Sequence, residues 1–273
     1  MNTWINGRRR EHIDYRDRGL QYGDGVFETM RIRDSRLRLL EYHLDRLYAG
    51  CRRLGIAGPT RPALRRELQR AAALRDEGIL KLIITRGVGL RGYRPTGFER
   101  PTRILSLHSL PAGSLDQAAI PARVRLCATR LGLNPALAGL KTLNRLESVM
   151  ARAEWRDARI WEGLMQDEDE NFVCGTMSNL FIKRGRSLMT PLLDRCGVAG
   201  VMRRWIMETA GQLRLRAIER RLRWRDLQEA EEVFMSNSLA GARSVSLLQK
   251  GTRILRLTHF ETAERLRALL DRL

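Results

Sequence analysis

One lysine stands out in a chain that otherwise uses arginine for positive charge. The sequence has 46 arginines and only four lysines, at positions 81, 141, 183 and 250. Lysine differs from arginine because it can lose its proton and then act as a nucleophile or a base. Lys141, within GLKTLNRLE, lies between an apolar loop and a helical pattern, where partial desolvation would favour the neutral amine. A lysine that extends into solvent would explain the same letters, so this residue alone does not decide its role.

Three other stretches combine glycine with charged residues in ways that suit ligand binding. In RDRGLQYGDGVFET, residues 16–29, Gly23 and Gly25 would let the backbone turn tightly and approach a partner closely. In GVAGVMRRW, residues 197–205, glycine leads directly into a helix whose free N–H groups suit a phosphate. In RGVGLRGYRP, residues 86–95, Arg91 could make a forked contact to a carboxylate. Taken singly, a hairpin entry, an ordinary helix start and a solvated loop explain these patterns equally well.

The elements that must position these residues alternate between strand and helix patterns, which predicts an α/β protein. We expect a strand at TWING, a hairpin over 25–40, helices over 43–56 and 61–78, and strands at 78–87 and 103–110. Residues 111–122 are predicted to be a linker between domains at 1–110 and 123–273. The second domain should hold a strand at 122–130, a helix over 142–158 with an apolar stripe at Leu143, Leu146, Met150 and Ala153, and two hairpins. A helix from Gly200, strands at 232–238 and 242–256 and an amphipathic C-terminal helix should follow.

Composition excludes several classes of protein. The apolar runs are too short to span a bilayer, and MNTWINGRRR lacks the apolar core of a secretory signal. Scattered cysteines and histidines argue against a metal site or a disulfide framework, and favour a reducing cytoplasm. The formal charge of +19 invites a nucleic-acid-binding interpretation, but the arginines spread along the whole chain and form no known binding module. We expect no nucleic acid and no membrane as partner, and we expect an anionic small-molecule substrate.

Read in order, six segments resemble the fold-type IV pyridoxal-phosphate enzymes, which include branched-chain aminotransferases, D-amino-acid aminotransferases and aminodeoxychorismate lyases. The segments are DRGLQYGDGVFET, HLDRL, RGVGLRGY, LKTLNRLE, GTMSNLF and GVMR, within a match from about residue 2 to residue 245. LNPALAG before the lysine, LNRLE after it and the RGYRP loop are most similar to the aminodeoxychorismate lyases. The resemblance implies two α/β domains with the active site in the interdomain cleft, and a homodimer.

The resemblance also implies roles for individual residues. Lys141 would hold pyridoxal 5'-phosphate as an imine and, once displaced by the substrate amine, would act as acid and base. The cofactor phosphate would be bound by Arg46, by the N–H groups of Val201 and Met202, and by Asn237 and Ser238. The substrate would contact Phe27 and Thr29 on a strand, and Arg91 and Tyr93 in the loop.

One position departs from the family pattern. The family usually places a glutamate, which pairs with the protonated pyridine nitrogen, five residues before the asparagine of its NLF motif. Counting back from Asn179 gives Cys174. A thiol cannot hold that proton as a carboxylate does, so we expect the cofactor ring to accept electrons less well. This expectation favours elimination, which discharges the carbanion through a leaving group, over transamination.

The resemblance therefore implies a cytoplasmic lyase that converts 4-amino-4-deoxychorismate to 4-aminobenzoate and pyruvate. Three alternatives remain: an aminotransferase on the same scaffold, a basic nucleic-acid-binding protein, and a relative without cofactor that serves as a scaffold.

Overall fold

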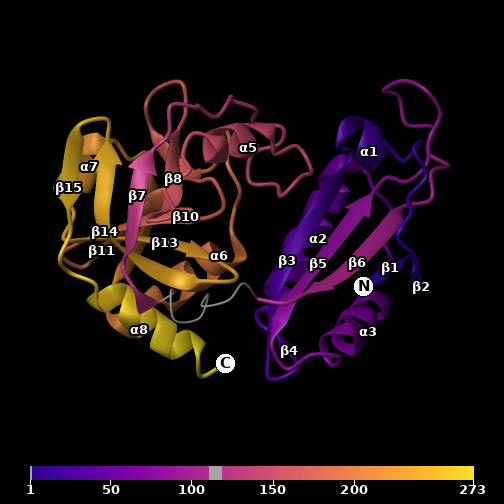
Figure 1. Ribbon diagram of the computed structural model, residues 1–273, viewed down its shortest axis with the longest axis horizontal. Helices are drawn as coiled ribbons and strands as arrows, with labels where there is room; N and C mark the ends of the chain where they lie inside the picture. The colour runs from indigo at the N-terminus through magenta and orange to yellow at the C-terminus, as the bar shows by residue number, and fades with distance from the viewer. Residues whose placement is uncertain (1, 111–118) are drawn as a thin grey trace. The chain divides into compact units, whose positions relative to one another are not determined.

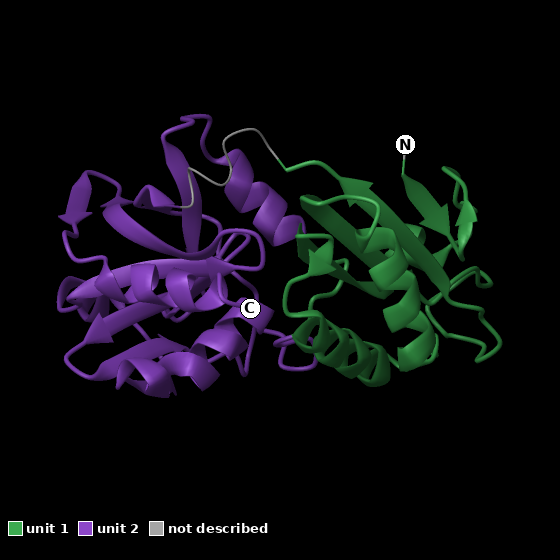
Figure 2. Cartoon of the chain, turned by 90° about the horizontal axis from the view of Figure 1, so that it is seen from below, with its two compact units in different colours: residues 1–112, 140–144 green, residues 113–139, 145–273 purple. Residues whose placement is uncertain are grey.

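The structure, a computed structural model, describes residues 2–110 and 119–273. The chain divides into two compact units, one of residues 1–112 with 140–144 and one of residues 113–139 with 145–273 (Figure 2). The predicted linker at 111–122 lies mostly outside the described residues. The sequence pattern grouped Lys141 with residues 123–273, whereas its segment belongs to the first unit.

The first unit is a six-stranded antiparallel sheet with two main helices, in the order β2-β1-β6-β5-β3-β4 (Figure 1). Its elements are β1 (Thr3–Ile5), β2 (Arg8–Arg9), α1 (Arg18–Tyr22), β3 (Gly25–Arg33), β4 (Arg36–Leu37), α2 (Leu40–Leu54), α3 (Arg61–Ala72), β5 (Gly78–Thr85) and β6 (Thr102–His108). Most of the strands and helices predicted for this half are therefore present. The predicted strand at TWING is β1, which pairs with β2 on one side and with β6 on the other.

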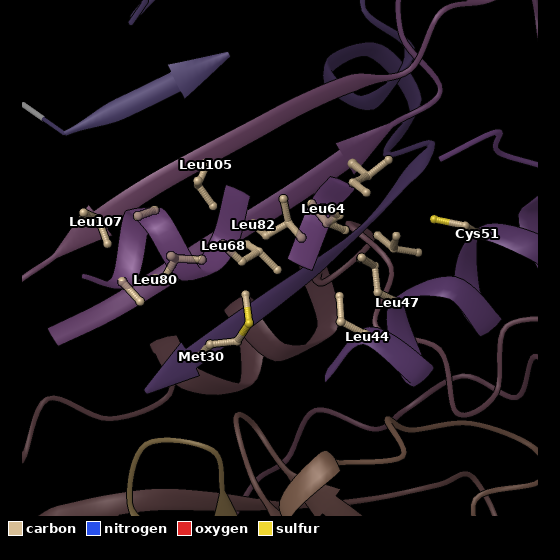
Figure 3. Close-up of a cluster of buried hydrophobic side chains, with 14 of the residues drawn as sticks. Met30, Leu44, Leu47, Cys51, Leu64, Leu68, Leu80, Leu82, Leu105 and Leu107 are labelled. Atoms are coloured by element: carbon tan, nitrogen blue, oxygen red, sulfur yellow. The ribbon is translucent and has the colours of Figure 1, made fainter. Parts of the chain in front are cut away.

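Strand alternation gives this sheet two different faces. Alternate residues of β3, β5 and β6 are fully buried and form one core with apolar residues of α2 and α3 (Figure 3). Leu44 and Leu47 from α2 and Leu64 and Leu68 from α3 all belong to it. Several of the intervening residues, among them Phe27 and Thr29, point to the other face and are only half-buried. Side chains on that second face are therefore available to bind a ligand.

The second unit is built on a nine-stranded sheet of mixed direction, in the order β12-β11-β10-β13-β14-β7-β8-β9 with β15 paired to β14. Its strands are β7 (Ala122–Leu126), β8 (Ile160–Gln166), β9 (Phe172–Gly175), β10 (Asn179–Arg184), β11 (Ser187–Pro191), β12 (Arg216–Arg220), β13 (Glu232–Asn237), β14 (Gly241–Lys250) and β15 (Arg253–Arg256). Its helices are α5 (Leu146–Ala153), α6 (Val201–Thr209), the 3-10 turn η1 (Ala210–Leu213), α7 (Trp224–Gln228) and α8 (Glu261–Leu270). The predicted hairpins are β8–β9 and β10–β11.

Two local predictions differ from the structure. The helix predicted over 142–158 is only α5, Leu146–Ala153, because the backbone just before it pairs with a strand instead. Its expected apolar stripe does not form a buried face, since Leu146 and Met150 are 77% and 62% exposed. The short helix α1 was not predicted, and Asp17 caps it by accepting a hydrogen bond from Gly19 N at 2.8 Å. Within the described residues, no helix is long and apolar enough to cross a membrane.

Candidate active site

The segment that carries Lys141 is fixed along the outer edge of strand β3. Phe27 N donates to the carbonyl of Lys141 at 3.0 Å, and Leu143 N donates to the carbonyl of Gly25 at 3.0 Å. This edge can accept the segment because β4 pairs only with the far end of β3, at Ile32 and Arg33. Lys141 therefore projects from a strand-like segment and not, as the sequence suggested, from the mouth of a helix.

Two glycines make this close approach possible. Gly23 ends α1 with φ +66°, and a Cβ there would lie 2.0 Å from Oδ1 of Asn144. A Cβ on Gly25 would lie 2.6 Å from the carbonyl oxygen of Ile84. Larger side chains would push the 141–144 segment away from β3. The prediction that these glycines allow a tight turn and a close backbone contact is confirmed.

The amine of Lys141 lies over an aromatic ring. Its Nζ is 4.1 Å from the centre of the Phe27 ring, and Nζ of Lys81 lies 5.7 Å from the same centre. Thr29 is directly opposite Lys81 in the β3–β5 pairing. Residues 27 and 29 share a strand face, so the structure brings three predicted residues, Lys141, Phe27 and Thr29, to one place. It also adds a second lysine there that the sequence did not single out.

Arg46 is held by a buried carboxylate on the face of β3 covered by α2. Its Nε and Nη2 donate to the two oxygens of Glu28 at 2.8 and 2.5 Å, and Nδ1 of His43 lies 2.6 Å from Glu28 Oε2. Burial by itself raises the pKa of Glu28, but Arg46 and His43 outweigh burial and lower that pKa to about 2. Burial lowers the pKa of His43, although the charge and hydrogen bond of Glu28 oppose that shift. An ionised Glu28 thus holds the guanidinium of Arg46 in place.

Glu28 and His43 were missed by sequence reasoning. The signal was present, since Glu28 interrupts the run of apolar residues on the core face of GVFETMRI. A charged residue at such a position is seldom fully buried without a partner.

Arg91 and Tyr93 lie in the loop between β5 and β6, in the first unit with Lys141. Both side chains are exposed, and the ring of Tyr93 is tilted by 60° against that of Tyr22 at a centre-to-centre distance of 5.4 Å. These exposed side chains are accessible to an anionic molecule.

In the second unit, the start of α6 has the form of an anion site. The first N–H groups of a helix, here those of Val201 and Met202, have no partner within the helix. Gly200 precedes them in extended conformation, and a Cβ on it would lie 2.0 Å from Oδ1 of Asn179. The amide of Asn179 donates to the carbonyl of Val198 at 2.9 Å and so holds the approach to the helix. The structure thus gives Asn179 a supporting role beside the two predicted N–H groups.

Asn237 and Ser238 lie at the end of strand β13. The side-chain oxygen of Asn237 accepts hydrogen bonds from Leu239 N at 3.0 Å and Ala240 N at 2.8 Å. Asn237 therefore shapes the turn that presents Ser238, which is half-buried.

Cys174 lies on β9 in a small apolar cluster, and burial raises the pKa of its thiol to about 12. The thiol is therefore uncharged near neutral pH. Its neighbour Glu162, another residue that sequence reasoning missed, is fully buried and accepts hydrogen bonds from Thr176 Oγ1 at 2.6 Å and Ser178 Oγ at 2.5 Å. Burial raises the pKa of Glu162. Glu162 organises the turn that leads from Cys174 to Asn179.

Each unit by itself offers groups of the kind that bind part of a molecule with an aldehyde and a phosphate. The first unit supplies a half-buried amine and a fixed guanidinium, and the second supplies a helix start with a glycine approach that a side chain would fill. In the part of the chain that the structure describes, no group of histidine, cysteine and acidic side chains could hold a metal ion.

Comparison with known proteins gives consistent matches over nearly the whole chain. The model of the family described as amino-transferase class IV matches residues 25–248. The chain is 36% identical over 245 residues to an aminodeoxychorismate lyase of Vibrio harveyi, covering 89% of this chain and 90% of that protein. It is 26% identical over 250 residues to a D-alanine aminotransferase of Listeria monocytogenes, covering 87% and 83%. The solved structure of 4-amino-4-deoxychorismate lyase from Pseudomonas aeruginosa is 43% identical, with a TM-score of 0.89 and coverage of 99% and 98%.

Proposed function

This chain belongs to the amino-transferase class IV family, and on that premise we propose that it converts 4-amino-4-deoxychorismate to 4-aminobenzoate and pyruvate. The predicted α/β fold and the predicted family are confirmed by the family match and by the Pseudomonas structure. The lyases of Vibrio and Pseudomonas are 36% and 43% identical, against 26% for the D-alanine aminotransferase, which favours the lyase reaction. The cofactor of this family of enzymes is pyridoxal 5'-phosphate.

The observation that carries the proposal is the placement of Lys141. Its main chain is hydrogen-bonded to β3, and its amine lies 4.1 Å from the centre of the Phe27 ring. A fixed amine beside an aromatic surface suits a group that must bond to a planar aldehyde and then move a proton. Arginine could do neither, because it stays protonated.

We propose that the residues predicted from the sequence bind the cofactor. Lys141 would hold its aldehyde carbon, while Arg46, the N–H groups of Val201 and Met202, and the turn at Asn237 and Ser238 would bind its phosphate. Cys174, supported by the turn at Asn179, would lie near its ring nitrogen. When bound, pyridoxal phosphate supplies an electron-withdrawing ring that stabilises negative charge on the amine-bearing carbon of the substrate.

The protein's own part in the reaction is positioning and proton transfer. Nζ of Lys141 takes the proton from the amine-bearing ring carbon of the substrate. The electron pair left on that carbon expels the neighbouring enolpyruvyl oxygen, and the six-membered ring becomes aromatic. The released enolate takes up a proton on carbon and becomes pyruvate. Aromatisation makes this step favourable, so the protein has mainly to orient the carbon–hydrogen bond towards Lys141.

The substrate would be held by its carboxylates and its ring. Arg91 offers a planar fork that matches a carboxylate, and Tyr93 lies two residues further along the same loop. Phe27 and Thr29 would line the opposite side, on the half-buried face of β3. These four contacts account for an anionic, ring-containing substrate.

We also propose a cytoplasmic homodimer. The four cysteines are all free and buried, as expected for a reducing compartment. On α5 the side chains of Leu146, Val149 and Met150 are 77%, 61% and 62% exposed, and their i, i+3, i+4 spacing forms one apolar face. A second copy of the chain would cover this face.

The decisive test is release of pyruvate from 4-amino-4-deoxychorismate by the purified protein without any amino acceptor. We expect one pyruvate for each 4-aminobenzoate formed. A requirement for a keto acid, with the amino group transferred to it, would identify an aminotransferase instead. Salt-sensitive binding to nonspecific DNA by a protein without a bound chromophore would favour the nucleic-acid alternative.

A further inference from the structure

The loop that carries Arg91 and Tyr93 has few contacts through its own side chains. Arg91, Tyr93 and Phe98 are exposed, and Glu99 bonds locally to Thr96 and to Gly97 N. Substrate contacts on such a loop are useful only if its backbone is held in place. The groups that hold it come from the segment before β3.

Arg18 is buried beneath this loop and bonds directly to its main chain. Its side chain is 4% exposed, and its Nη1 and Nη2 donate to the carbonyls of Gly92 at 2.8 Å and Tyr93 at 2.7 Å. Its Nε donates to Asp24 at 3.0 Å, and its Cζ lies 4.9 Å from the centre of the Tyr22 ring. One planar guanidinium thus bridges two successive loop carbonyls and a carboxylate, which a lysine cannot do.

Further contacts tie the loop to the same place. Gly92 N donates to the hydroxyl of Tyr22 at 3.3 Å, and the main chain of Arg18 donates to the carbonyl of Gly87 at 2.9 Å. A Cβ on Gly89 would lie 2.7 Å from Cδ of Arg18, so the loop packs tightly on the arginine stem. The loop is therefore built around Arg18.

A second arginine shares the same carboxylate without contacting this part of the loop. Nε and Nη2 of Arg86 donate to Asp24 at 2.7 and 3.1 Å, and its guanidinium also bonds to the carbonyls of Leu54 and Gly55 at the end of α2. Arg86 and Arg18 thus differ in what they hold: one the end of a helix, the other the carbonyls at 92 and 93.

We propose that Arg18 is a positioning residue that fixes the backbone at Gly92 and Tyr93 and thereby aims Arg91 and Tyr93 at the substrate. The identity of the substrate in this inference rests on the proposed function. The loop clamp, which is the pair of hydrogen bonds from Arg18 to the carbonyls of Gly92 and Tyr93, does not depend on that function. Without Arg18 the two carbonyls would lose their donors, and the loop would sample many conformations.

The test compares Arg18→Met with Arg86→Met, since each removes one arginine from Asp24. For Arg18→Met we expect KM for 4-amino-4-deoxychorismate to rise roughly 10- to 100-fold, with kcat and the affinity for pyridoxal phosphate close to wild type. For Arg86→Met we expect KM to stay near wild type. A wild-type KM in Arg18→Met, or an equal rise in both variants, would overturn the inference.

Limited proteolysis tests the Arg18 clamp without any substrate. Tyr93 and Phe98 are 83% and 90% exposed and are cleavage sites for chymotrypsin, so mass spectrometry can follow cutting within the loop. We expect faster cutting there in Arg18→Met and in the milder Arg18→Lys, and wild-type rates in Arg86→Met. Arg18→Lys keeps a charge for Asp24 and provides a folded variant if Arg18→Met unfolds. If the wild type released no pyruvate, the proposed function would fail, while the cutting rates would still decide the clamp.

Discussion

Cys174 has charged neighbours that decide what a substitution there would do. The charge of Glu162 raises the pKa of its thiol, after the larger effect of burial, and the charge of Arg145 lowers it. A carboxylate at 174 would have an arginine nearby to stabilise it and a buried carboxyl group opposing it. Burial and Glu162 would therefore oppose a charge at this position, and Arg145 would favour it.

We expect Cys174→Glu to raise aminotransfer at least about tenfold, with lyase activity little changed, because a carboxylate stabilises a protonated ring nitrogen and so strengthens the electron sink. The measurement is keto-acid-dependent amino transfer alongside pyruvate release. Cys174→Ser is the matched control, since it changes the side chain without adding charge. No change in either activity would show that the residue at 174 does not set how well the cofactor ring accepts electrons.

Glu28 gives a prediction on stability and pH. Its pKa in the folded protein is about 2 against an ordinary value of 4.5, which corresponds to about 3 kcal/mol. Because the folded-state pKa is lowered, this stabilisation is present above about pH 4.5 and is lost as the pH falls through about 2. We expect Glu28→Gln to lower the free energy of unfolding by about 3 kcal/mol at pH 7 and by much less at pH 3.

Urea unfolding at several pH values measures this difference. Glu77→Gln is the control, because its carboxylate pairs with the buried Arg31 but is itself 42% exposed, and we expect a smaller effect there. A loss in Glu28→Gln that is the same at pH 7 and pH 3 would show that ionisation of this carboxyl group is not what stabilises the pair.

Single residues were predictable from the sequence where the chemistry depends on residue type alone. Lys141 could be singled out because arginine replaces lysine almost everywhere else. The sequence marks Glu28 as unusual on an apolar face, but it does not show the partners of Glu28 or Glu162. Those partners are 14 to 18 positions away and meet them only through the packing of α2 on β3 or the turn after β9. The lysine at 81 was missed for the same reason, since only the β3–β5 pairing brings it to Phe27.

At the scale of elements, the start of α5 was predicted four residues too early. Residues 142–145 continue the apolar period of the helix, but the segment 141–143 pairs with β3 instead, as tertiary hydrogen bonds outweigh a local preference. The apolar residues 146, 149 and 150 then remain exposed. The residues are apolar, as the pattern indicates, but they form no buried face in the structure.

We expect the double substitution Leu146→Glu and Met150→Glu to shift the protein from dimer to monomer, because two charges would be buried in the proposed interface. Sedimentation at micromolar concentration measures the shift. Ile254→Glu is the control, since Ile254 on β15 is 53% exposed and lies outside this face. A dimer that survives the double substitution would place the interface elsewhere.

At the scale of the whole molecule, the charge of +19 has a kinetic consequence. Many arginines are paired with acidic side chains, but the excess creates a positive field that attracts an anionic substrate over a distance of about a Debye length. We expect kcat/KM to fall several-fold as salt is raised from low to high concentration, with kcat nearly constant. Steady-state kinetics over a series of salt concentrations measure this change. A kcat/KM that does not depend on salt would contradict electrostatic steering of the substrate.

The place of Lys141 in the sequence did not show which compact unit it belongs to. Residue 141 follows the predicted linker, yet residues 140–144 belong to the compact unit formed by the start of the chain. Residues 140–144 join this unit through a few backbone hydrogen bonds to residues more than 100 positions earlier, and no local pattern encodes this pairing.

The central claim is that one amine, that of Lys141, binds the aldehyde of the cofactor. Borohydride reduction of the purified protein, followed by peptide mass spectrometry, tests it most directly. Lys81→Ala is the matched control, because both lysines lie against Phe27. We predict a yellow absorbance band and a reduced adduct on the peptide with Lys141 in the wild type and in Lys81→Ala, and neither in Lys141→Ala. An adduct on Lys81, or none on any peptide after incubation with pyridoxal phosphate, would contradict the account.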